Sequence, residues 1–172
     1  MTEIEKNIDR VINEEIDMSE AAIMSKKDWL IECPLMHTFF PGIYIRQMSA
    51  QAGSFITSAI HKTTHPFFVM EGKLNVFGSR AGAQILEAPY MGMTIAGTRR
   101  IAYVQKDCFW VTIHQLNYIT GKENDWDEER KETLLKRIEA DILEPHINCI
   151  THTDIREDYN EYIKNRRLIC QQ

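Results

Sequence analysis

Residues 53–77 read Gly53-Ser-Phe-Ile-Thr-Ser-Ala-Ile-His61-Lys-Thr-Thr-His65-Pro-Phe-Phe-Val-Met-Glu71-Gly72-Lys-Leu-Asn-Val-Phe77. Apolar and β-branched residues form short runs in this stretch, and glycine or polar residues separate the runs. Such a pattern is typical of β-strands joined by turns. His61 and His65 lie between two of these runs. The stretch therefore predicts strands that carry a pair of candidate functional histidines.

The same pattern continues on both sides of this stretch. Short apolar runs alternate with glycine, proline and charged turn signals, and they predict strands over 43–48, 55–60, 67–70, 73–77, 84–88, 93–95, 101–105 and 108–116. Short strands at nearly regular spacing indicate an antiparallel sandwich or barrel. No helix-length run interrupts them, which disfavours a parallel sheet built from βαβ units.

Helical periodicity is found before this region. Apolar residues near the N-terminus recur every three or four positions and predict a helix over about 3–17. A second, short helical stretch is predicted over 19–27, with Ser19 as its N-cap. We therefore assign residues 1–30 to an N-terminal helical arm.

Helical periodicity returns after the predicted strands. Asn124 or Asp125 can cap a helix that Pro145 ends, and a last helix is predicted to start at Thr153 or Asp154. These signals divide the rest of the chain into a β-barrel over 31–120 and C-terminal helices over 121–172. The C-terminal helices are expected to pack on the barrel or on a second subunit.

Composition narrows the class of protein. The chain has 172 residues and a net charge of −5, which predicts one domain large enough to fold without a disulfide or a metal. The four cysteines form no CxxC pair, so we expect reduced thiols in the cytoplasm. The N-terminus is too polar for a signal peptide, and no apolar run is long enough for a membrane span. Mild acidity argues against a nucleic-acid polymer as partner.

The charge is unevenly distributed along the chain. The net charge is −5 over residues 1–20, +4 over 21–120 and −4 over 121–145. One interpretation is that the helical surfaces simply carry the acidic residues. The other is that the basic central region attracts an anionic ligand.

The stretch quoted above resembles the first motif of the cupin superfamily. That motif has a glycine, His-x-His, a glutamate three or four residues later, and a glycine seven residues beyond the glutamate. Counting back from Gly72, His65 falls on the glutamate position, His61 on the second histidine and Ala59 on the first. The stretch 69–76 is similar to the family's hairpin between two barrel strands.

A second cupin motif, Pro-x-Gly-x-x-His, has a counterpart in residues 95–100. Gly97 is kept there, whereas Ile95 replaces the proline and Arg100 replaces the histidine ligand. The resemblance covers about residues 43–116. It implies a mainly β fold, namely a single cupin-type antiparallel jelly-roll barrel with N-terminal and C-terminal α-helical additions.

Two short stretches also resemble small uncharacterised cupin-like proteins of bacteriophages. They are Ala88-Pro-Tyr-Met-Gly92 and Gly97-Thr-Arg-Arg100. This resemblance implies that the protein is phage-encoded and acts in the host cytoplasm.

Strand alternation then selects candidate pocket residues. Residues 55, 57, 59 and 61 share one face of a strand, and the resemblance implies that this face and Arg100 point into the barrel. On the last strand, one face carries Cys108, Trp110, Thr112 and His114, and the other carries Phe109, Val111 and Ile113. Either face can point inward, and His114 joins the pocket only if the first one does.

Two kinds of chemistry use these residues. His61, His65 and His114 could form a three-histidine site for zinc, iron or manganese. Alternatively, Arg99 and Arg100 could bind a carboxylate or phosphate through their guanidinium groups. In that case His61 and His65 donate hydrogen bonds or exchange protons.

An anionic ligand of the second kind could be phosphorylated, nucleotide-like or a carboxylate. Phe67, Tyr103 and Trp110 could stack on its ring. Metal-free epimerase-type cupins are a related possibility, which implies a catalytic histidine (His61 or His65) and a tyrosine acid, Tyr103 or Tyr90. The sequence shows no paired aspartate for such a base.

Three classes of function follow from these residues. The first is a small-molecule-binding protein with a pocket for an anionic ligand. The second is a cupin-type enzyme, either a metal-dependent oxygenase or isomerase or an epimerase acting on a metabolite or sugar nucleotide. The third is an interaction protein, such as a virion-associated one, that uses the barrel as a scaffold. We expect a homodimer in each case, because the amphipathic helices offer apolar faces.

Overall fold

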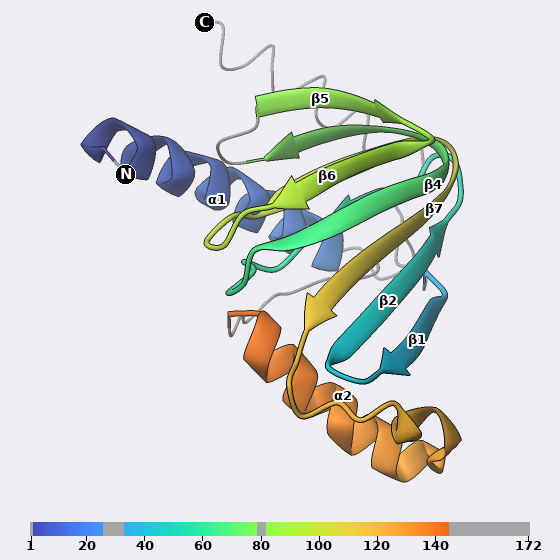
Figure 1. The fold of residues 1–172 in the computed structure, drawn as a ribbon. Helices are drawn as coiled ribbons and strands as arrows, with labels where there is room; N and C mark the ends of the chain where they lie inside the picture. Colours follow the sequence, from blue (N-terminus) through green and yellow to red (C-terminus); the bar gives the residue numbers. More distant parts are fainter. Residues whose placement is uncertain (1, 26–32, 79–81, 145–172) are drawn as a thin grey trace, which may run out of the picture.

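The computed structural model describes residues 2–25, 33–78 and 82–144, in which seven β-strands lie between two α-helices (Figure 1). The helices are α1 Glu3–Met24 and α2 Glu128–Ile142, and a short 3₁₀ helix covers Lys122–Asp125. The strands are β1 Leu35–Phe40, β2 Ile43–Ala50, β3 Phe55–Thr57, β4 His65–Gly78, β5 Gly82–Glu87, β6 Tyr90–Thr94 and β7 Arg100–Gln115. The helix predicted from Thr153 or Asp154 lies outside the described residues.

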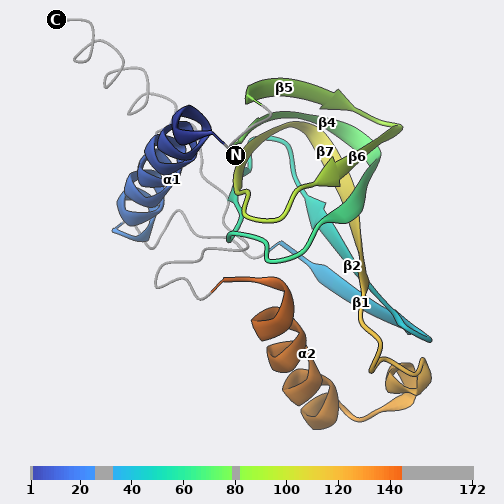
Figure 2. The ribbon, with the colours of Figure 1, turned by 60° about the vertical axis from the view of Figure 1, so that its left-hand side comes forward.

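Two long strands, β4 and β7, each take part in two layers. The first half of β4 pairs with β6 and with the second half of β7, which also pairs with β2 and through it with β1. The second half of β4 pairs with β5 and with the first half of β7, which also pairs with β3. All of these pairings are antiparallel, and the strands curve around a common interior (Figure 2). The predicted fold class is confirmed: a mainly β, antiparallel jelly roll with helical additions.

The bend in the long strands corrects two predictions from the sequence. The register of β4 against β7 shifts between Val69 and Leu74, where Gly72 has a φ of 88°. A side chain on Gly72 would overlap the backbone carbonyl of Asp107. β-bulges bend a strand without ending its pairing, so residues 69–76 form no hairpin. For the same reason, the two strands predicted over 101–105 and 108–116 are one strand.

The core has two parts. One lies inside the barrel, where Val69, Leu74 and Val104 are almost fully buried. The other joins the end of the barrel to α2, and Phe39 packs there with Ile138. Phe39 belongs to β1, a strand that the sequence analysis did not predict.

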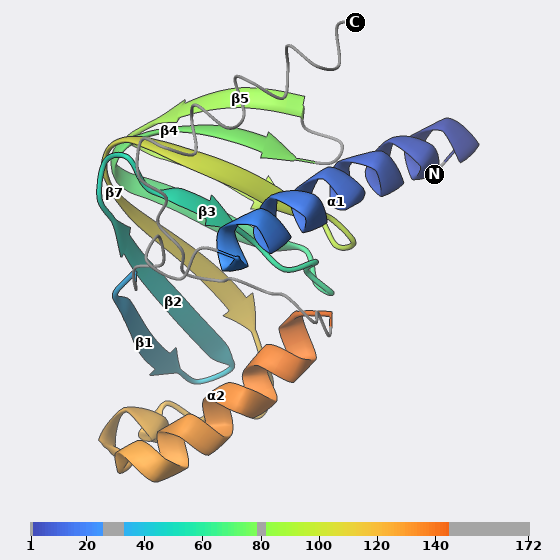
Figure 3. The same ribbon diagram turned by 180° about the vertical axis from the view of Figure 1, so that it is seen from behind.

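The N-terminal helix is continuous, which corrects the prediction of two helices. Ser19 does not act as an N-cap, because its hydroxyl donates a hydrogen bond to the backbone carbonyl of Glu15 within the same helix, at 2.8 Å. α1 runs past β3 on the outside of the barrel (Figure 3). Its acidic residues Asp17 and Glu20 form ion pairs with Arg99.

The start of α2 also differs from the prediction. Asp127 is the N-cap, and its side chain accepts a hydrogen bond from the backbone of Arg130. Asn124 instead bonds to both backbone groups of Phe39 and so ties the 3₁₀ helix to β1. Neither helix in the described part of the chain has the length and apolar content needed to cross a bilayer.

Candidate functional site

A cavity of about 110 Å³ lies inside the barrel. Its polar lining residues are Arg46, Thr57, Ser58, His61, Thr94, Arg100, Thr112 and His114. Its apolar lining includes Met48, Ile56, Leu74, Val76, Val104, Cys108 and Trp110, and Leu143 completes it after the end of α2. Among the described residues, no aspartate or glutamate lines this cavity.

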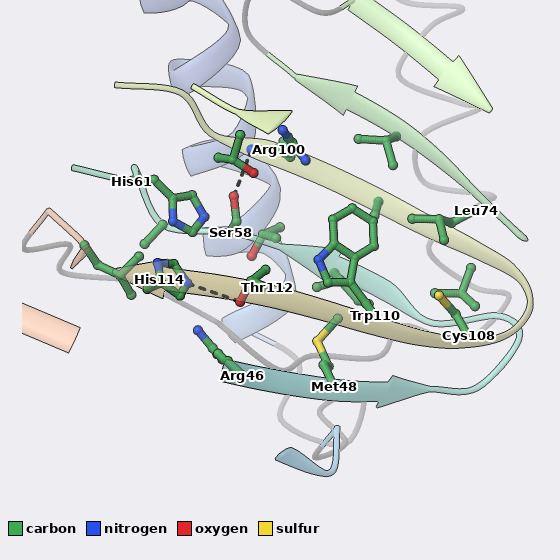
Figure 4. Close-up of a pocket in the computed structure, with 18 residues that line it drawn as sticks. Arg46, Met48, Ser58, His61, Leu74, Arg100, Cys108, Trp110, Thr112 and His114 are labelled. Atoms are coloured by element: carbon green, nitrogen blue, oxygen red, sulfur yellow. Dashed lines mark hydrogen bonds between the residues drawn. The ribbon is translucent and has the colours of Figure 1, made fainter. Parts of the chain in front are cut away.

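Strand β7 supplies one wall of the cavity. Cys108, Trp110, Thr112 and His114 all line it, so this face of the strand points inward (Figure 4). The neighbouring strand β2 adds residues at matching positions, because Arg46 pairs with Thr112. The alternative that the sequence left open is thereby decided in favour of the face that carries His114.

Three histidines form a cluster at one end of the cavity. The ring centroid of His65 lies 4.7 Å from that of His61 and 4.2 Å from that of His114. His61 and His114 line the cavity, whereas His65 is 3% exposed and lies against them without lining it. His65 Nδ1 lies 3.0 Å from the carbonyl oxygen of Thr63. A carbonyl can only accept, so Nδ1 carries the proton and Nε2 holds the lone pair.

Burial keeps the cavity histidines neutral. Together with smaller effects from His65, His114, Arg100 and Arg46, it lowers the pKa of His61 to about 2. Burial likewise lowers the pKa of His114 to about 3, with a smaller effect from His65 and Arg46. The pKa of His65 is also lowered, mainly by burial. At neutral pH the positive charge of the cavity is therefore carried by its arginines.

The histidine cluster does not fit the predicted metal. Neutral imidazoles are common metal ligands, and His61 Nδ1, His65 Nε2 and His114 Nδ1 are buried without a hydrogen-bond partner in the described residues. However, no group of three or more histidine, cysteine or carboxylate side chains in that part of the chain is arranged to hold a metal ion. Two arginines also line the same cavity, and their charge opposes a cation. This set of side chains is therefore unsuited to hold zinc, iron or manganese.

Arg100 lines the cavity beside the histidine cluster. Its Nη2 donates a hydrogen bond to the carbonyl of Met93 at 3.0 Å, and its guanidinium carbon lies 4.5 Å from the ring centroid of Phe67. Burial lowers its pKa, but an arginine keeps its charge near neutral pH. Within the described residues, no carboxylate forms an ion pair with Arg100. The guanidinium therefore brings a positive charge into the cavity that an anion can neutralise.

Arg99 does not belong to the cavity, contrary to the prediction. Its side chain is 1% exposed, forms ion pairs with Asp17 and Glu20, and donates from Nε to the carbonyl of Ser58 at 2.8 Å. Neighbouring residues of an extended chain point to opposite sides. Since Arg100 points inward, Arg99 points outward to α1 and has a structural role.

The two predicted aromatic residues of β7 have different positions. Trp110 lines the cavity, and its indole stacks on Phe67 with an interplanar angle of 7° and a centroid distance of 4.5 Å. Tyr103 does not line it, because Ala102 and Val104 on either side of it point inward. Tyr103, one of the two predicted catalytic acids, is therefore on the wrong face of the strand for epimerase-type chemistry, and the other, Tyr90, does not line the cavity either.

Sequence reasoning missed several lining residues, of which Arg46 and Leu143 are instructive. Arg46 alternates with Tyr44 and Met48 in a strand that was predicted, and this alternation could have revealed an arginine on an inward face. Leu143 reaches the cavity because its backbone bridges to that of His61. No local pattern in the sequence signals such a long-range contact.

Comparisons with known proteins were made by sequence and by structure. No family model matches the chain, and no curated protein matches it in sequence. The backbone is similar to that of ectoine synthase from P. lautus, with 12% identity and a TM-score of 0.45, over 61% of this chain and 80% of that one.

Two further solved structures show the same kind of likeness. A protein with a double-stranded β-helix domain from Klebsiella pneumoniae has 13% identity and a TM-score of 0.44, over 54% of this chain and 87% of that one. The cupin domain of Cnp3 from Schizosaccharomyces pombe has 14% identity and a TM-score of 0.43, over 51% of this chain and 63% of that one. These likenesses are partial, so the strand pairing of this chain itself carries the fold assignment.

Proposed function

We propose that this protein is a cupin-like barrel that binds a small anionic molecule in its interior cavity. The observation that carries the proposal is the position of Arg100. Its guanidinium lines the cavity, and the described residues offer it no carboxylate. Arg46 adds a second guanidinium to the lining. Guanidinium groups match the geometry of carboxylates and phosphates.

The polar groups around Arg100 support the same conclusion. Hydroxyl groups of Thr94 and Thr112 line the cavity with the neutral imidazoles of His61 and His114. Each of these groups can donate a hydrogen bond to an anion. Within the described residues, His61 Nδ1 and His114 Nδ1 are buried without a hydrogen-bond partner. A barrel that served only as a scaffold would have no use for such groups, because they are costly.

Calorimetry with chosen anions tests this proposal. We expect at least one of inorganic phosphate, AMP and benzoate to bind the full chain. Arg100→Ala should weaken that binding at least tenfold, because a charge-assisted hydrogen bond contributes roughly 1.5–3 kcal/mol. Arg10→Ala is the matched control, since Arg10 is an exposed residue of α1 whose ion pair within the described residues is with Glu14. Failure of all three anions to bind, or an unchanged affinity in Arg100→Ala, would contradict the proposal.

The proposal also includes the origin and the cellular location that the sequence resemblance implies. The stretches 88–92 and 97–100 resemble cupin-like proteins of bacteriophages, and this supports a phage-encoded protein in the host cytoplasm. Detection of the chain in the soluble fraction of infected cells, and not in purified virions, is the result expected. Its presence in virions would favour the interaction protein instead.

A further inference from the structure

The cavity changes character along its length. On the second half of β7 the inward residues are His114 and Thr112 at one end and Trp110 and Cys108 at the other. The six residue steps from 108 to 114 span about 20 Å in a β-strand. β2 repeats this order, because Arg46 pairs with Thr112 and Met48 pairs with Trp110. One end of the cavity is thus polar and the other is apolar.

The facing strands show the same division (Figure 4). Ser58, His61 and Arg100 lie together at the polar end, and the backbone amide of Arg100 donates to Ser58 Oγ at 2.9 Å. Leu74 lies at the apolar end, where it pairs with Val104 across the bend of the two long strands. The two ends are therefore built from residues of several strands, not from one strand alone.

The apolar end limits what the body of a ligand can carry. Met48, Leu74 and Val104 offer no hydrogen-bonding side chain to a ligand. Burial also raises the pKa of the Cys108 thiol to about 11, as expected in an apolar environment. A sugar or phosphodiester placed here would leave most of its buried hydroxyls or charges without partners, because Trp110 offers a single N–H donor and Cys108 only a weak S–H donor. A hydrocarbon body meets no such penalty.

The volume sets the size of the ligand. The cavity measures about 110 Å³, and a cavity of about 150 Å³ is known to hold a benzene molecule. Because the cavity is smaller than that, the enclosed part of a ligand is no larger than one small ring or a short alkyl chain. A nucleotide is too large to be enclosed.

From the polar end, the apolar end and the volume together, we infer that the ligand is a small apolar monocarboxylate. Its carboxylate faces Arg100 and Arg46, and its ring or alkyl chain lies against Met48, Leu74 and Trp110. Benzoate and hexanoate represent this class. The inference rests on the proposed function and narrows the anion to one chemical class.

A ligand panel separates this inference from the proposed function. We expect benzoate and hexanoate to bind the full chain in calorimetry, and benzyl alcohol, which has the ring without the charge, to bind at least tenfold more weakly. If phosphate or AMP binds more tightly than benzoate in an Arg100-dependent manner, the inference is overturned and the proposed function stands. If no anion binds, both fail.

A chain-length series tests the apolar end without any substitution. From acetate to hexanoate, affinity should rise about fourfold with each added methylene until the cavity is full, and it should stop rising for longer chains. A series with equal affinities would overturn the inference.

A substitution inside the cavity gives a second test. In Ala102→Leu the larger side chain should fill part of the cavity and weaken the binding of hexanoate at least tenfold. Ile101→Leu, on the opposite face of the same strand, is the matched control and should leave the affinity unchanged. Equal effects in the two variants, with both folded by circular dichroism, would overturn the placement of the alkyl chain.

Discussion

Glu20 of α1 and Arg99 of the barrel form an ion pair that is closed to solvent. Their side chains are 0% and 1% exposed, and Glu20 Oε2 lies 2.5 Å from Arg99 Nη2. Arg99 also bonds to the backbone of Ser58, directly after β3. The pair therefore fixes the position of α1 on the outside of the barrel, next to the wall that carries Ser58 and Arg100.

Removal of Arg99 should destabilise the protein strongly. In Arg99→Met the carboxylate of Glu20 is left buried without its cation, and breaking a buried pair in this way costs about 3–5 kcal/mol. Urea denaturation measures the loss. Arg10→Ala breaks the exposed pair with Glu14 and should lower the free energy of unfolding by less than about 1 kcal/mol. A similar small loss in Arg99→Met would show that the buried pair does not anchor α1.

The bend of the barrel strands depends on Gly72. In Gly72→Ala the new methyl group meets the carbonyl of Asp107, so the two long strands must separate, and we expect loss of most folded protein at 37 °C. Gly53→Ala is the control: Gly53 also has a positive φ but has no atom within 4 Å of the new methyl group. Gly53→Ala should lower the free energy of unfolding by only about 1–3 kcal/mol. Thermal unfolding compares the two variants, and equal melting temperatures would contradict the role of Gly72.

Acid should destabilise the protein through its neutral histidines. His114 has a pKa of about 3 in the folded chain and about 6.5 when unfolded. The unfolded chain therefore binds more protons below pH 6.5, and stability falls as the pH drops from 6.5 toward 3. At pH 5 the loss from His114 is about 2 kcal/mol, and His61 acts in the same direction.

Urea unfolding at pH 7.5, 6.5 and 5.0 measures this effect. The decrease in stability between pH 6.5 and 5.0 should be smaller in His114→Gln than in the parent protein. A parent protein equally stable at all three values would show that the histidines are not held neutral.

Metal content can be measured directly. Because Arg46 and Arg100 line the cavity with the histidines, we expect less than one equivalent of metal in protein purified without a histidine tag. Elemental analysis checks this. One equivalent of zinc, iron or manganese that is lost in His61→Ala would contradict our description and favour the metal-dependent enzyme.

The chain should form a homodimer. On α1, Ile4, Ile8 and Val11 are 72%, 49% and 51% exposed, and their spacing places them on one face of the helix. A second copy could cover this apolar face. Light scattering at micromolar concentration should give twice the mass of the chain, and Ile8→Lys should give the monomer mass. A monomeric parent protein would contradict the prediction.

Much of the fold could be predicted because short apolar runs between turn signals are a local property of the sequence. The continuity of β4 and β7 could not, because the bend depends on the contact between Gly72 and Asp107 across two strands. Turn signals at such a bend resemble the signals at the end of a strand.

The candidate site was predicted only in part, for a similar reason. The positions of His61 and Arg100 followed from the motif frame, whereas strand alternation left open whether the face with Trp110 and His114 points inward. The same alternation implies that only one of Arg99 and Arg100 can point inward, and it assigns Tyr103 to the outer face. The ion pairs that hold Arg99 against α1 connect residues 82 and 79 positions apart, and no local pattern predicts them.

The segment at the end of α2 completes the wall of the cavity. Ligand binding in the cavity is therefore coupled to the docking of residues 142–144 against residues 60–62. Leu143 lines the cavity, the amide of Lys62 donates to the carbonyl of Ile142, and the amide of Glu144 donates to the carbonyl of Ile60. A molecule held in the cavity stabilises only the state in which this segment is docked. A ligand bound in the cavity would therefore slow hydrogen exchange at the amides of Lys62 and Glu144. The exchange rates at the end of α2 would then differ between the empty and the filled barrel.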